Sequence, residues 1–583
     1  MACAVLRRST LTFRFAEPHR GCIMSDSPFN ALNAKVSRRT FAQGTALATG
    51  AFFINTKFSR SMLANVPASP ATTPWMQPLA FAPWKTPIPF GQQYVTGSPI
   101  DESRHQRYDE FRPVKFYEMQ ACEQLCRLHP QLGLSPLSTY DGCVPGPTFM
   151  MRYGEPTHCR ISNCLPAAPV GYGNCDVTTH VHNGHHAPES DGGPWNIHSP
   201  GSYHDHHWPN IYATDITTGH PDKREAKGTL WYHDHCLDFT SQNVYRGLTG
   251  FWLLFDDLDS GNENDPNPDA FRLPSGVPDG KRVKNRYDIP LVFTDRNFDP
   301  ITGVQTMDLL NMDGILGDKF LVNGRVQPYF EVERRKYRFR LLDGGISRGY
   351  DIWLSNGMTF QYLANDGNMI PVPMEVQNVK LLVAERADII VDFSQLPAST
   401  TELYLVNRAE QTNGRAPTGN TLPMNQANQL LKFIIRPGSV TDNSRVPTFL
   451  REQPEMNVPV VGERTFALTR SNGVWTVNGN IFDQNRCDAA VKINTAEIWN
   501  FSTAGGWAHP LHNHCEEPRY LLINGHSVVG TQQQGRKDVH PLYPGDQVKV
   551  YIKFRDWLGK YPMHCHNLIH EDHAMMVRWD ITA

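Results

Sequence analysis

Hydrophobic and polar residues alternate along several short stretches of the chain. Two clear examples are 336–341, where Tyr337, Phe339 and Leu341 are separated by basic residues, and 548–554 near the C-terminus. A period of two is typical of a β-strand that buries one face and exposes the other. With 44 glycines and 44 prolines available for turns, the pattern predicts an all-β protein built from many short strands.

A weak internal repeat divides these strands into three groups. It is marked by three similar turns, at 140–142, 322–324 and 477–479, each followed by an alternating stretch. Such a repeat predicts three β-sandwich domains with Greek-key connections. Polar, proline-rich segments at 259–285 and 438–460 are typical of linkers. We therefore place the domains, in chain order, at 80–258, 286–437 and 461–583.

The composition narrows the class of protein. The 583 residues carry 55 Lys+Arg against 58 Asp+Glu, a net charge of −3. With no long basic run, this balance argues against nucleic acid as the main partner. Hydrophobic residues make up 40% and charged residues 19% of the chain, which excludes a disordered protein and a coiled coil.

The N-terminal region, residues 1–66, resembles a twin-arginine export signal. The paired arginines at 38–39 precede a mildly apolar run, 41–54, that is too short to span a bilayer as a helix. We expect cleavage after Ala64 or Ala68, which would leave the mature protein in the periplasm or secreted, without membrane insertion. An uncleaved anchor and a disordered tail are the alternatives for this region.

Six cysteines lie close together in the first predicted domain. They are Cys122, Cys126, Cys143, Cys159, Cys164 and Cys175. In an oxidising compartment such a group usually forms disulfides. We expect a structural role for these cysteines, with a pairing that the sequence leaves open.

Histidine is distributed very unevenly. Of 24 histidines, fifteen precede position 236, nine follow position 508 and none lies between. Eight of them form four His-x-His pairs, at 180/182, 233/235, 512/514 and 564/566. Residues two apart project from the same face of a strand, so each pair can aim two imidazoles at one metal ion. A single His-x-His pair usually belongs to a solvent-exposed strand face and binds no metal. Two pairs at each end of the chain predict a metal site shared by the first and third domains, with the second domain as a spacer.

Cys565 indicates which metal binds. It lies between His564 and His566 and therefore points to the opposite face of the strand. Together with His509, His570 and Met575 it supplies the two imidazoles, the thiolate and the weak thioether of a blue-copper electron-transfer site. Because single peptide bonds join Cys565 to both neighbouring histidines, electrons taken up there would have a short bonded route to the histidine cluster.

These motifs resemble those of the multicopper oxidases. His509-Pro-Leu-His-Asn-His514 and His564-Cys-His-Asn-Leu-Ile-His-Glu-Asp-His-Ala-Met-Met576 are similar to the family's third and fourth copper motifs. The closest resemblance is to the branch of bilirubin oxidases and spore-coat laccases, which shares the Trp-Tyr-His-Asp-His run at 231–235. The resemblance covers nearly all of the mature chain and implies three cupredoxin-like Greek-key domains.

By position, the resemblance implies four copper ions. The type 1 ligands would be His509, Cys565, His570 and Met575. The type 2 ligands would be His180 and His512. The type 3 pair would be held by His182, His233, His235, His514, His564 and His566. A methionine at the axial position implies a potential toward the lower part of the family's range.

The resemblance also implies roles for two acidic residues and one tryptophan. Glu571 matches the acid that assists oxygen reduction in spore-coat laccases, and Asp191 matches an acid of the type 2 water channel. Either carboxylate could relay protons, and the alternative is that it only orients a ligand histidine. Trp507 resembles the tryptophan beside the type 1 site of bilirubin oxidases. It is expected to shape the substrate face, with simple packing as the alternative.

A second run of histidines is unusual for the family. Tyr203-His204-Asp205-His206-His207-Trp208 contains three imidazoles beyond the twelve ligands. An accessory metal site is one interpretation of this run. We favour the other, a polar loop.

The predicted function is that of a secreted, monomeric, laccase-like oxidase. It would use O₂ to oxidise phenolic, aromatic amine or tetrapyrrole donors, with electrons entering at an exposed edge of His509. One alternative is a metallo-oxidase of the same family acting on Mn(II) or Cu(I), although scattered methionines weaken the case for Cu(I). The alternative from another class is the copper-free relative that serves as a structural cell-division protein, but this chain has lost none of the ligands.

Overall fold

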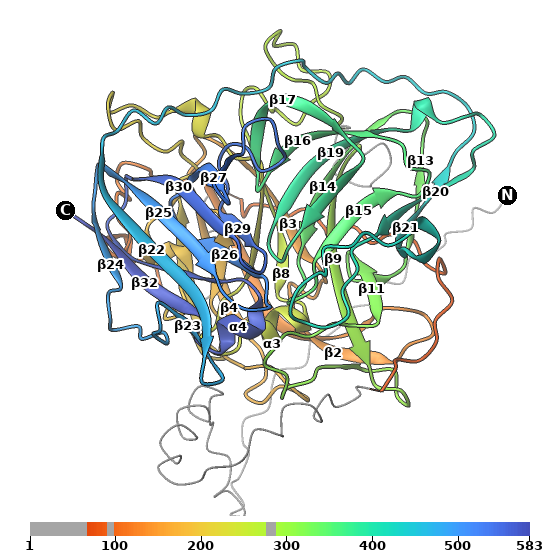
Figure 1. Cartoon of the computed structure of the whole chain (residues 1–583), viewed down its shortest axis with the longest axis horizontal. Helices are drawn as coiled ribbons and strands as arrows, with labels where there is room; N and C mark the ends of the chain where they lie inside the picture. The colour runs from red at the N-terminus through yellow and green to blue at the C-terminus, as the bar shows by residue number, and fades with distance from the viewer. Residues whose placement is uncertain (1–66, 90–97, 276–286) are drawn as a thin grey trace, which may run out of the picture.

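The computed structural model describes residues 67–89, 98–275 and 287–583 of the 583-residue chain. The paired arginines and the expected cleavage position at Ala64 lie outside the described residues. Strands dominate the described part, which confirms the all-β prediction. Six sheets form three pairs along the chain, and Figure 1 shows them in order through orange, green and blue.

The first pair of sheets lies within the first predicted domain. One sheet has the order β2-β1-β4-β6 and the other β3-β8-β7-β5. The strands are β1 (Lys115–Arg127), β2 (Leu134–Tyr140), β3 (Gly146–Arg152), β4 (Thr157–Cys164), β5 (Thr179–His182), β6 (Tyr203–Trp208), β7 (Thr229–Asp234) and β8 (Thr249–Phe255). Alternate residues of β1, namely Tyr117, Met119 and Ala121, are buried in the core between the sheets.

The second pair of sheets holds the middle of the chain. One sheet has the order β12-β11-β9-β14-β19-β16-β17, with β10 added on β9, and the other β13-β21-β20-β15-β18. The strands are β9 (Asp288–Phe298), β10 (Gln305–Thr306), β11 (Lys319–Val322), β12 (Arg325–Val326), β13 (Tyr329–Val332), β14 (Lys336–Asp343), β15 (Tyr350–Leu354), β16 (Phe360–Asn365), β17 (Asn368–Val376), β18 (Asn378–Leu381), β19 (Arg386–Asp392), β20 (Glu402–Asn407) and β21 (Asn428–Ile435).

The third pair of sheets ends the chain. Its orders are β23-β22-β25-β30-β27-β28 and β24-β32-β31-β26-β29. The strands are β22 (Val460–Ser471), β23 (Val474–Val477), β24 (Ala489–Lys492), β25 (Thr495–Thr503), β26 (His509–Asn513), β27 (Arg519–Ile523), β28 (His526–Ser527), β29 (Val539–Leu542), β30 (Gln547–Phe554), β31 (Gly559–Cys565) and β32 (Met576–Thr582). The first two pairs fall within the predicted ranges and β22 begins one residue before the third range, while the exact domain boundaries stay a prediction.

Helices are short in the described residues. The α-helices are α2 (Pro188–Asp191), α3 (Thr240–Arg246) and α4 (Leu568–Asp572). The 3₁₀ helices are η2 (Glu102–Arg104), η3 (Lys223–Glu225), η4 (Phe393–Gln395) and η5 (Met424–Gln426). Helices α3 and α4 are far apart in the sequence but share one buried apolar cluster, and Figure 1 shows the two helices near each other. None of these helices combines the length and the apolar character needed to cross a membrane.

The internal repeat is visible in the backbone. In the three pairs of sheets, β1 with β4, β9 with β14, and β22 with β25 are parallel neighbours. The three predicted turns share one conformation, with positive φ at both central residues: Asp141-Gly142, Asn323-Gly324 and Asn478-Gly479. Asn, Asp and Gly tolerate this left-handed backbone best, which is why the repeat can be recognised from these dipeptides.

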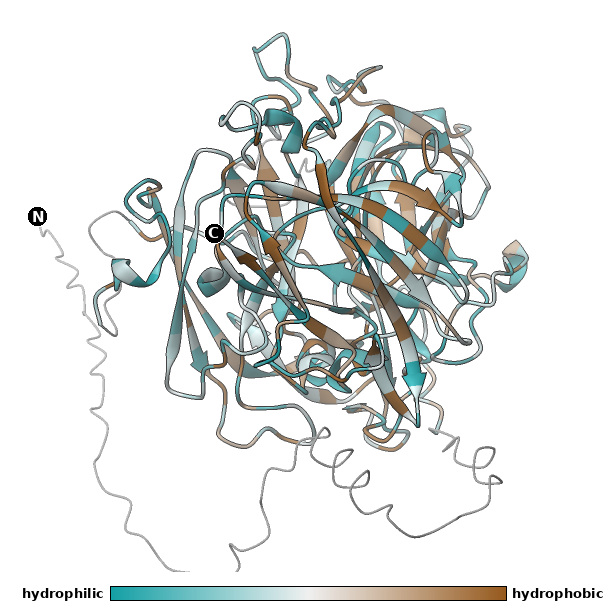
Figure 2. Cartoon of the chain, turned by 60° about the vertical axis from the view of Figure 1, so that its left-hand side comes forward, coloured by the Kyte–Doolittle hydropathy of each residue, from teal (hydrophilic) through white to brown (hydrophobic). Residues whose placement is uncertain are grey.

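Strand β14 differs from its prediction in one respect. Tyr337, Phe339 and Leu341 are buried as expected, and Figure 2 shows such interleaving of hydrophobic and hydrophilic residues along several strands. However, Arg338 and Arg340 on the opposite face are buried as well. That face packs against the first pair of sheets, where Arg340 Nη1 donates to the Thr229 hydroxyl at 2.8 Å. The alternating pattern thus marks a strand that is buried on both faces. The face expected to be exposed carries ion-paired arginines instead.

Candidate metal centre

One cluster of potential ligands lies where β26 and β31 meet α4. Cys565 Sγ is 3.4 Å from His509 Nδ1 and 3.6 Å from His570 Nδ1, and these two nitrogens are 3.2 Å apart. All three side chains are fully buried. One sulfur and two imidazole nitrogens therefore face a common point, which is the arrangement expected of the predicted type 1 ligands.

Met575, the predicted fourth ligand of this cluster, is held close to it by the backbone. The Met575 carbonyl accepts a hydrogen bond from the Cys565 N–H at 3.0 Å, and the Met575 N–H donates to the His570 carbonyl at 3.1 Å. Its side chain is fully buried in the same core as Cys565. Burial raises the pKa of the Cys565 thiol well above its usual value, so a metal ion that binds the thiolate must displace this proton.

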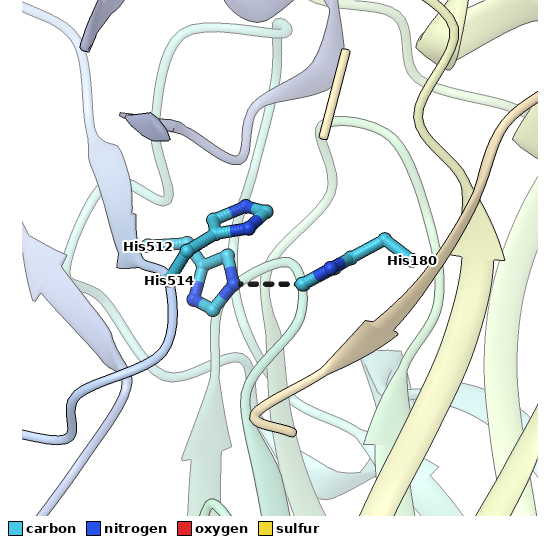
Figure 3. Close-up of side chains that lie close together, drawn as sticks. All are labelled: His180, His512 and His514. Atoms are coloured by element: carbon cyan, nitrogen blue, oxygen red, sulfur yellow. Dashed lines mark hydrogen bonds between the residues drawn. The ribbon is translucent and has the colours of Figure 1, made fainter. Parts of the chain in front are cut away.

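A second cluster forms where strands from the two ends of the chain face each other. In the first pair of sheets, β5 and β7 place His180 opposite His233. In the third, β26 and β31 place His512 opposite His564. Each of these residues belongs to a His-x-His pair, so eight buried imidazoles meet there. Figure 3 shows His512 and His514 reaching from the third pair of sheets toward His180 in the first.

Distances join these imidazoles in overlapping sets, within which the predicted ligands of each copper type can be located. His180 Nε2 and His512 Nε2 are 3.3 Å apart, as expected of the two type 2 ligands. His235 Nε2 lies 3.3 Å from His514 Nε2 and 3.1 Å from His564 Nε2, and the last two atoms are 3.2 Å apart. These three nitrogens could hold one ion of the predicted type 3 pair.

The remaining three imidazoles form the group for the other type 3 ion. His182 Nδ1 lies 3.4 Å from His233 Nε2. The centre of the His566 ring is 5.0 Å from that of His182 and 5.1 Å from that of His233. The structure thus brings together all eight predicted ligands of the cluster, and the assignment of single rings to the type 2 and type 3 ions stays a prediction.

The chemistry of this donor set fits copper ions. Burial, reinforced by neighbouring imidazoles, holds the pKa values of His182, His233 and His512 well below the usual range. These rings are therefore neutral and offer a lone pair. Both ring nitrogens of the buried His566 lack a hydrogen-bond partner among the described residues, an unfavourable state for a polar group unless it has a ligand. Neutral imidazoles and a buried thiol are common copper ligands.

Backbone carbonyls orient several of these rings. They accept hydrogen bonds from His180 Nδ1, His233 Nδ1 and His512 Nδ1 at 2.6, 2.8 and 2.9 Å. Each bond places the ring proton on Nδ1 and leaves the Nε2 lone pair pointing into the cluster. The three rings are thereby set in the tautomer that a metal requires.

Glu571 joins two imidazoles of one group. Its Oε1 lies 3.1 Å from His235 Nδ1 and its Oε2 lies 2.8 Å from His564 Nδ1. Burial alone would raise the pKa of Glu571, but His564 and His235 outweigh it and hold the pKa well below the ordinary value. In this state the carboxylate orients two ligands, and the predicted role in proton relay stays a prediction.

Asp191, at the end of α2, holds the first and third pairs of sheets together at the cluster. Its Oδ2 lies 2.7 Å from His514 Nδ1, while its backbone carbonyl accepts the hydrogen bond from His180 Nδ1 at 2.6 Å. Burial would raise the pKa of Asp191, but His514 and His180 lower it well below the ordinary value. Asp191 therefore positions two ligands, and its predicted role in the water channel stays a prediction.

Asp538 is a third carboxylate at the cluster, and no sequence motif indicated it. Its Oδ2 lies 2.7 Å from His182 Nε2 and 3.3 Å from His512 Nδ1. The opposite oxygen pairs with Arg386 at 2.9 Å. Burial raises the pKa of Asp538 to about 8 although Arg386 opposes the shift. Its sequence position, just before β29 and far from every His-x-His pair, gave no signal.

The prediction of an exposed His509 edge is wrong. His509 is fully buried, and so is His570. The His570 Nε2–H donates to the carbonyl of Asp313 at 3.2 Å, and the Trp475 ring lies 3.8 Å from the His570 ring. Trp507, predicted to shape the substrate face, is partly exposed and lies 5.2 Å from Trp475, ring to ring. Loops of the second pair of sheets and these indoles cover both imidazoles.

The prediction of a polar loop at 203–208 is also wrong. These residues form β6, and His206 is fully buried. His204 Nε2 and His206 Nδ1 donate to the carbonyls of Glu189 and Ser190 at 2.9 and 3.0 Å. Trp208 Nε1 donates to the same Ser190 carbonyl at 3.1 Å. The strand therefore anchors helix α2, which carries Asp191.

The expected disulfides are not formed by five of the six clustered cysteines. Cys122, Cys126, Cys143, Cys159 and Cys164 are free thiols. Cys159 lies on the buried face of β4 and is separated in this way from the exposed Cys164 on the same strand. Cys122 and Cys164 are register partners on the neighbouring strands β1 and β4, yet their thiols are unbonded to each other.

Comparison with known proteins shows that the chain is similar to multicopper oxidases. A family model described as multicopper oxidase matches residues 454–583. The bilirubin oxidase of Albifimbria verrucaria is 30% identical over 503 residues, which cover 83% of this chain and 80% of that protein. The laccase of Bacillus subtilis is 27% identical over 542 residues, covering 84% and 96%. A solved multicopper oxidase of Campylobacter jejuni, described as a metallo-oxidase, superposes with a TM-score of 0.67 at 17% identity, covering 89% and 98%.

Proposed function

Because this chain belongs to the multicopper oxidase family, we propose that it oxidises small phenolic, aromatic amine or tetrapyrrole donors one electron at a time. As a member of the family it is an oxidoreductase that uses copper, O₂ and a reducing substrate. For a phenol, the proposed reaction takes four electrons and four protons from four donors and combines them with O₂ to give two waters. Each donor leaves as a phenoxyl radical.

The sequence His564-Cys565-His566 carries this proposal. Cys565 faces His509 and His570, while His564 and His566 face the imidazoles of the other cluster. The two clusters are thus joined through one peptide bond on each side of a single residue. Such a connection is suited to moving electrons between two sites, and a protein that only stores copper would gain nothing from it.

The residues present could hold four copper ions. His509, Cys565, His570 and Met575 would hold the ion that accepts electrons from the donor. The eight clustered imidazoles would hold three more, which supply the electrons for reduction of O₂. Glu571, Asp191 and Asp538 keep the ligand rings oriented. Asp538, whose pKa is raised by burial to about 8, is best suited of the three to hold a proton near neutral pH.

A metallo-oxidase acting on Mn(II) is the second candidate. The charged side chains near the Cys565 cluster argue against it. Asp313, whose backbone carbonyl accepts from His570, has its carboxylate paired with both Arg415 and Arg470. Two guanidinium groups around one carboxylate leave a net positive charge, which repels a divalent cation. A copper-free structural role is disfavoured because every ligand position is filled and the imidazoles converge.

We also propose export by the twin-arginine route, on the strength of the paired arginines at 38–39. A folded, copper-loaded protein in the periplasm or outside the cell is the expected product. Fractionation of cells expressing the full chain and a variant with both arginines changed to lysine tests this. Retention of the variant in the cytoplasm is expected, and equal export of both forms would contradict the proposal.

The oxidase function is tested on purified copper-loaded protein. About four copper ions per chain and an intense absorption at about 600 nm are expected. Steady-state rates on a phenol, bilirubin, Mn(II) and Cu(I), measured side by side with O₂ consumption, then identify the donor class. Absence of the absorption band with fewer than about four coppers would overturn the proposal, and a strong preference for Mn(II) would overturn the donor class.

A further inference from the structure

The access route to His570 is closed by an indole ring. The Trp475 and His570 rings lie 3.8 Å apart, and the Trp475 ring is also 5.5 Å from that of His509. Trp475 itself is fully buried, and its Nε1–H donates to the Met312 carbonyl at 2.9 Å. A small donor in solvent therefore cannot touch either imidazole. Trp475 is the aromatic side chain that lies between these two imidazoles and the protein surface.

Trp507 continues this contact toward the surface. Its ring lies 5.2 Å from that of Trp475 in an edge-to-face arrangement, and the residue is partly exposed. The Arg415 guanidinium lies 4.7 Å and that of Arg470 lies 5.4 Å from the centre of the Trp507 ring. Arg470 also lies 4.8 Å from the Trp475 ring. One partly exposed indole is thus flanked by two cationic groups.

The two arginines are held by the second pair of sheets. Asp313 accepts from Arg415 Nε at 3.1 Å and is also bonded by Arg470 Nη1. The loops around Gly314 and Gly414 are in backbone contact, since a Cβ on Gly414 would come within 1.9 Å of the Gly314 carbonyl oxygen. The Arg415 carbonyl also accepts from the Ala508 N–H at 2.8 Å. These bonds fix the arginines relative to the strand that carries His509.

The charge of this surface selects a kind of donor. Two guanidinium groups share one carboxylate, and the side chain of Arg415 is 48% exposed while that of Arg470 is 22% exposed. An acid group on a donor can pair with the unsatisfied donors of either arginine. The ring of the same donor can stack on the exposed part of Trp507.

We propose that Trp507, Arg415 and Arg470 form a docking site for an aromatic donor that bears a carboxylate or sulfonate, and that Trp475 connects this site to His570. The inference rests on the proposed oxidase function and names its donor class. The docked donor gives up one electron, and a phenolic donor also releases its hydroxyl proton to solvent. Trp475 and Trp507 supply the van der Waals contact that the exposed imidazole edge was expected to supply.

Docking is tested without turnover, on copper-depleted protein. The probe is 3,4-dimethoxybenzoate, which has the ring and the acid group but no oxidisable hydroxyl, with its methyl ester as the neutral counterpart. Titration calorimetry should show binding of the acid that weakens with added salt, and much weaker binding of the ester. Arg470→Gln and Arg415→Gln should each weaken binding about fivefold.

A matched control is available elsewhere in the second pair of sheets. Arg408 lies 4.4 Å from the Trp353 ring, which is another arginine–tryptophan pair away from the copper ligands. Arg408→Gln should leave binding of 3,4-dimethoxybenzoate unchanged. Equal affinity for acid and ester, or equal loss in the Arg408 and Arg470 variants, would overturn the docking site.

The connecting role of Trp475 is tested on copper-loaded protein. Trp475→Phe keeps an aromatic ring and Trp475→Leu removes it, and both should retain the absorption at about 600 nm if copper is still held. The rate at which syringate bleaches this band without O₂ should fall much more in the Leu variant than in the Phe variant. Equal rates would overturn the connecting role. If wild-type protein has no such band, the oxidase proposal fails instead, whereas docking of the acid probe is still measurable.

Discussion

His570 and Glu571 are consecutive residues of α4, yet their side chains serve different clusters. His570 Nδ1 lies 3.6 Å from Cys565 Sγ, while Glu571 reaches His564 Nδ1 at 2.8 Å and His235 Nδ1 at 3.1 Å. The short helix therefore adds a second covalent connection between the two clusters, beside the one through Cys565. A shift of α4 would disturb both clusters together.

Cys565→Ser should abolish the blue absorption and the oxidase activity. A serine hydroxyl does not supply the thiolate on which the electron-accepting site depends. Loss of the band at about 600 nm, measured with copper content, is the expected result. Cys515→Ser is the control, because Cys515 is buried in the same core but is not a predicted ligand. A blue, active Cys565→Ser protein would contradict the assignment.

Glu571→Gln should slow oxygen reduction without affecting entry of electrons. A carboxylate can accept a hydrogen bond at each of its two oxygens, whereas an amide has only one oxygen that accepts. One of the two imidazole rings therefore loses its orientation. Such changes around a metal typically reduce activity about 10- to 100-fold. Bleaching of the blue band by a donor should stay at its wild-type rate, whereas its return on adding O₂ should slow. Asp572→Asn, whose carboxylate accepts a hydrogen bond from the Ser241 N–H, should behave like wild type.

His206→Phe should weaken copper binding at a distance. The substitution removes the hydrogen bond to the Ser190 carbonyl at 3.0 Å, and α2 then loses one of the anchors that position Asp191. Copper content and the paramagnetic signal of the type 2 ion should decrease, whereas the blue band should persist. His129→Phe, which removes a similar buried bond to the Thr73 carbonyl at 3.0 Å, should leave copper binding unchanged. Identical copper loss in both variants would point to general destabilisation.

The buried histidines near β6 should make the copper-depleted protein sensitive to acid. Burial, with the neighbouring His207 and His204, lowers the pKa of His105 to about 4. In the unfolded chain the same group has a pKa of about 6.5. Between these two values the unfolded state binds the proton and the folded state does not, so stability falls as the pH decreases through that interval.

The size and the control of this acid effect follow from the same shift. His105 alone would contribute up to about 3 kcal/mol by pH 4. Urea unfolding at a series of pH values should show a smaller decrease for His105→Gln than for wild type. An unchanged decrease in the variant would exclude His105 as a source.

The copper ligands could be predicted from sequence because their geometry is local. A His-x-His pair on a strand needs no distant information to aim two rings at one point, and Cys565 faces away from its neighbours for the same reason. The three turns could be recognised because their positive φ values restrict the residue types. Both predictions rest on backbone geometry: the structure brings the predicted histidines together in overlapping sets and gives the three turns positive φ, whereas the assignment of single rings to copper types stays a prediction.

Features that depend on tertiary contacts between separate elements could not be predicted in this way. Asp538 reaches His182 from far along the chain, and Trp475 covers His570 only because β23 packs beside α4. The histidines of β6 are polar, and nothing local shows that the carbonyls of α2 would satisfy them in the interior. Exposure of His509 was expected from its role, whereas burial is decided by loops of another domain.

Asp313 and Arg415 place part of the proposed docking surface in the domain without copper ligands, where the loops around Gly314 and Gly414 are in backbone contact. The rest of that surface, Arg470 and Trp507, lies in the same domain as His509. Mutations confined to the two loops would therefore change the proposed contacts to the donor while leaving every predicted copper ligand in place. A library restricted to 308–315 and 411–415 would sample donor preference in this way without altering the residues proposed to reduce oxygen.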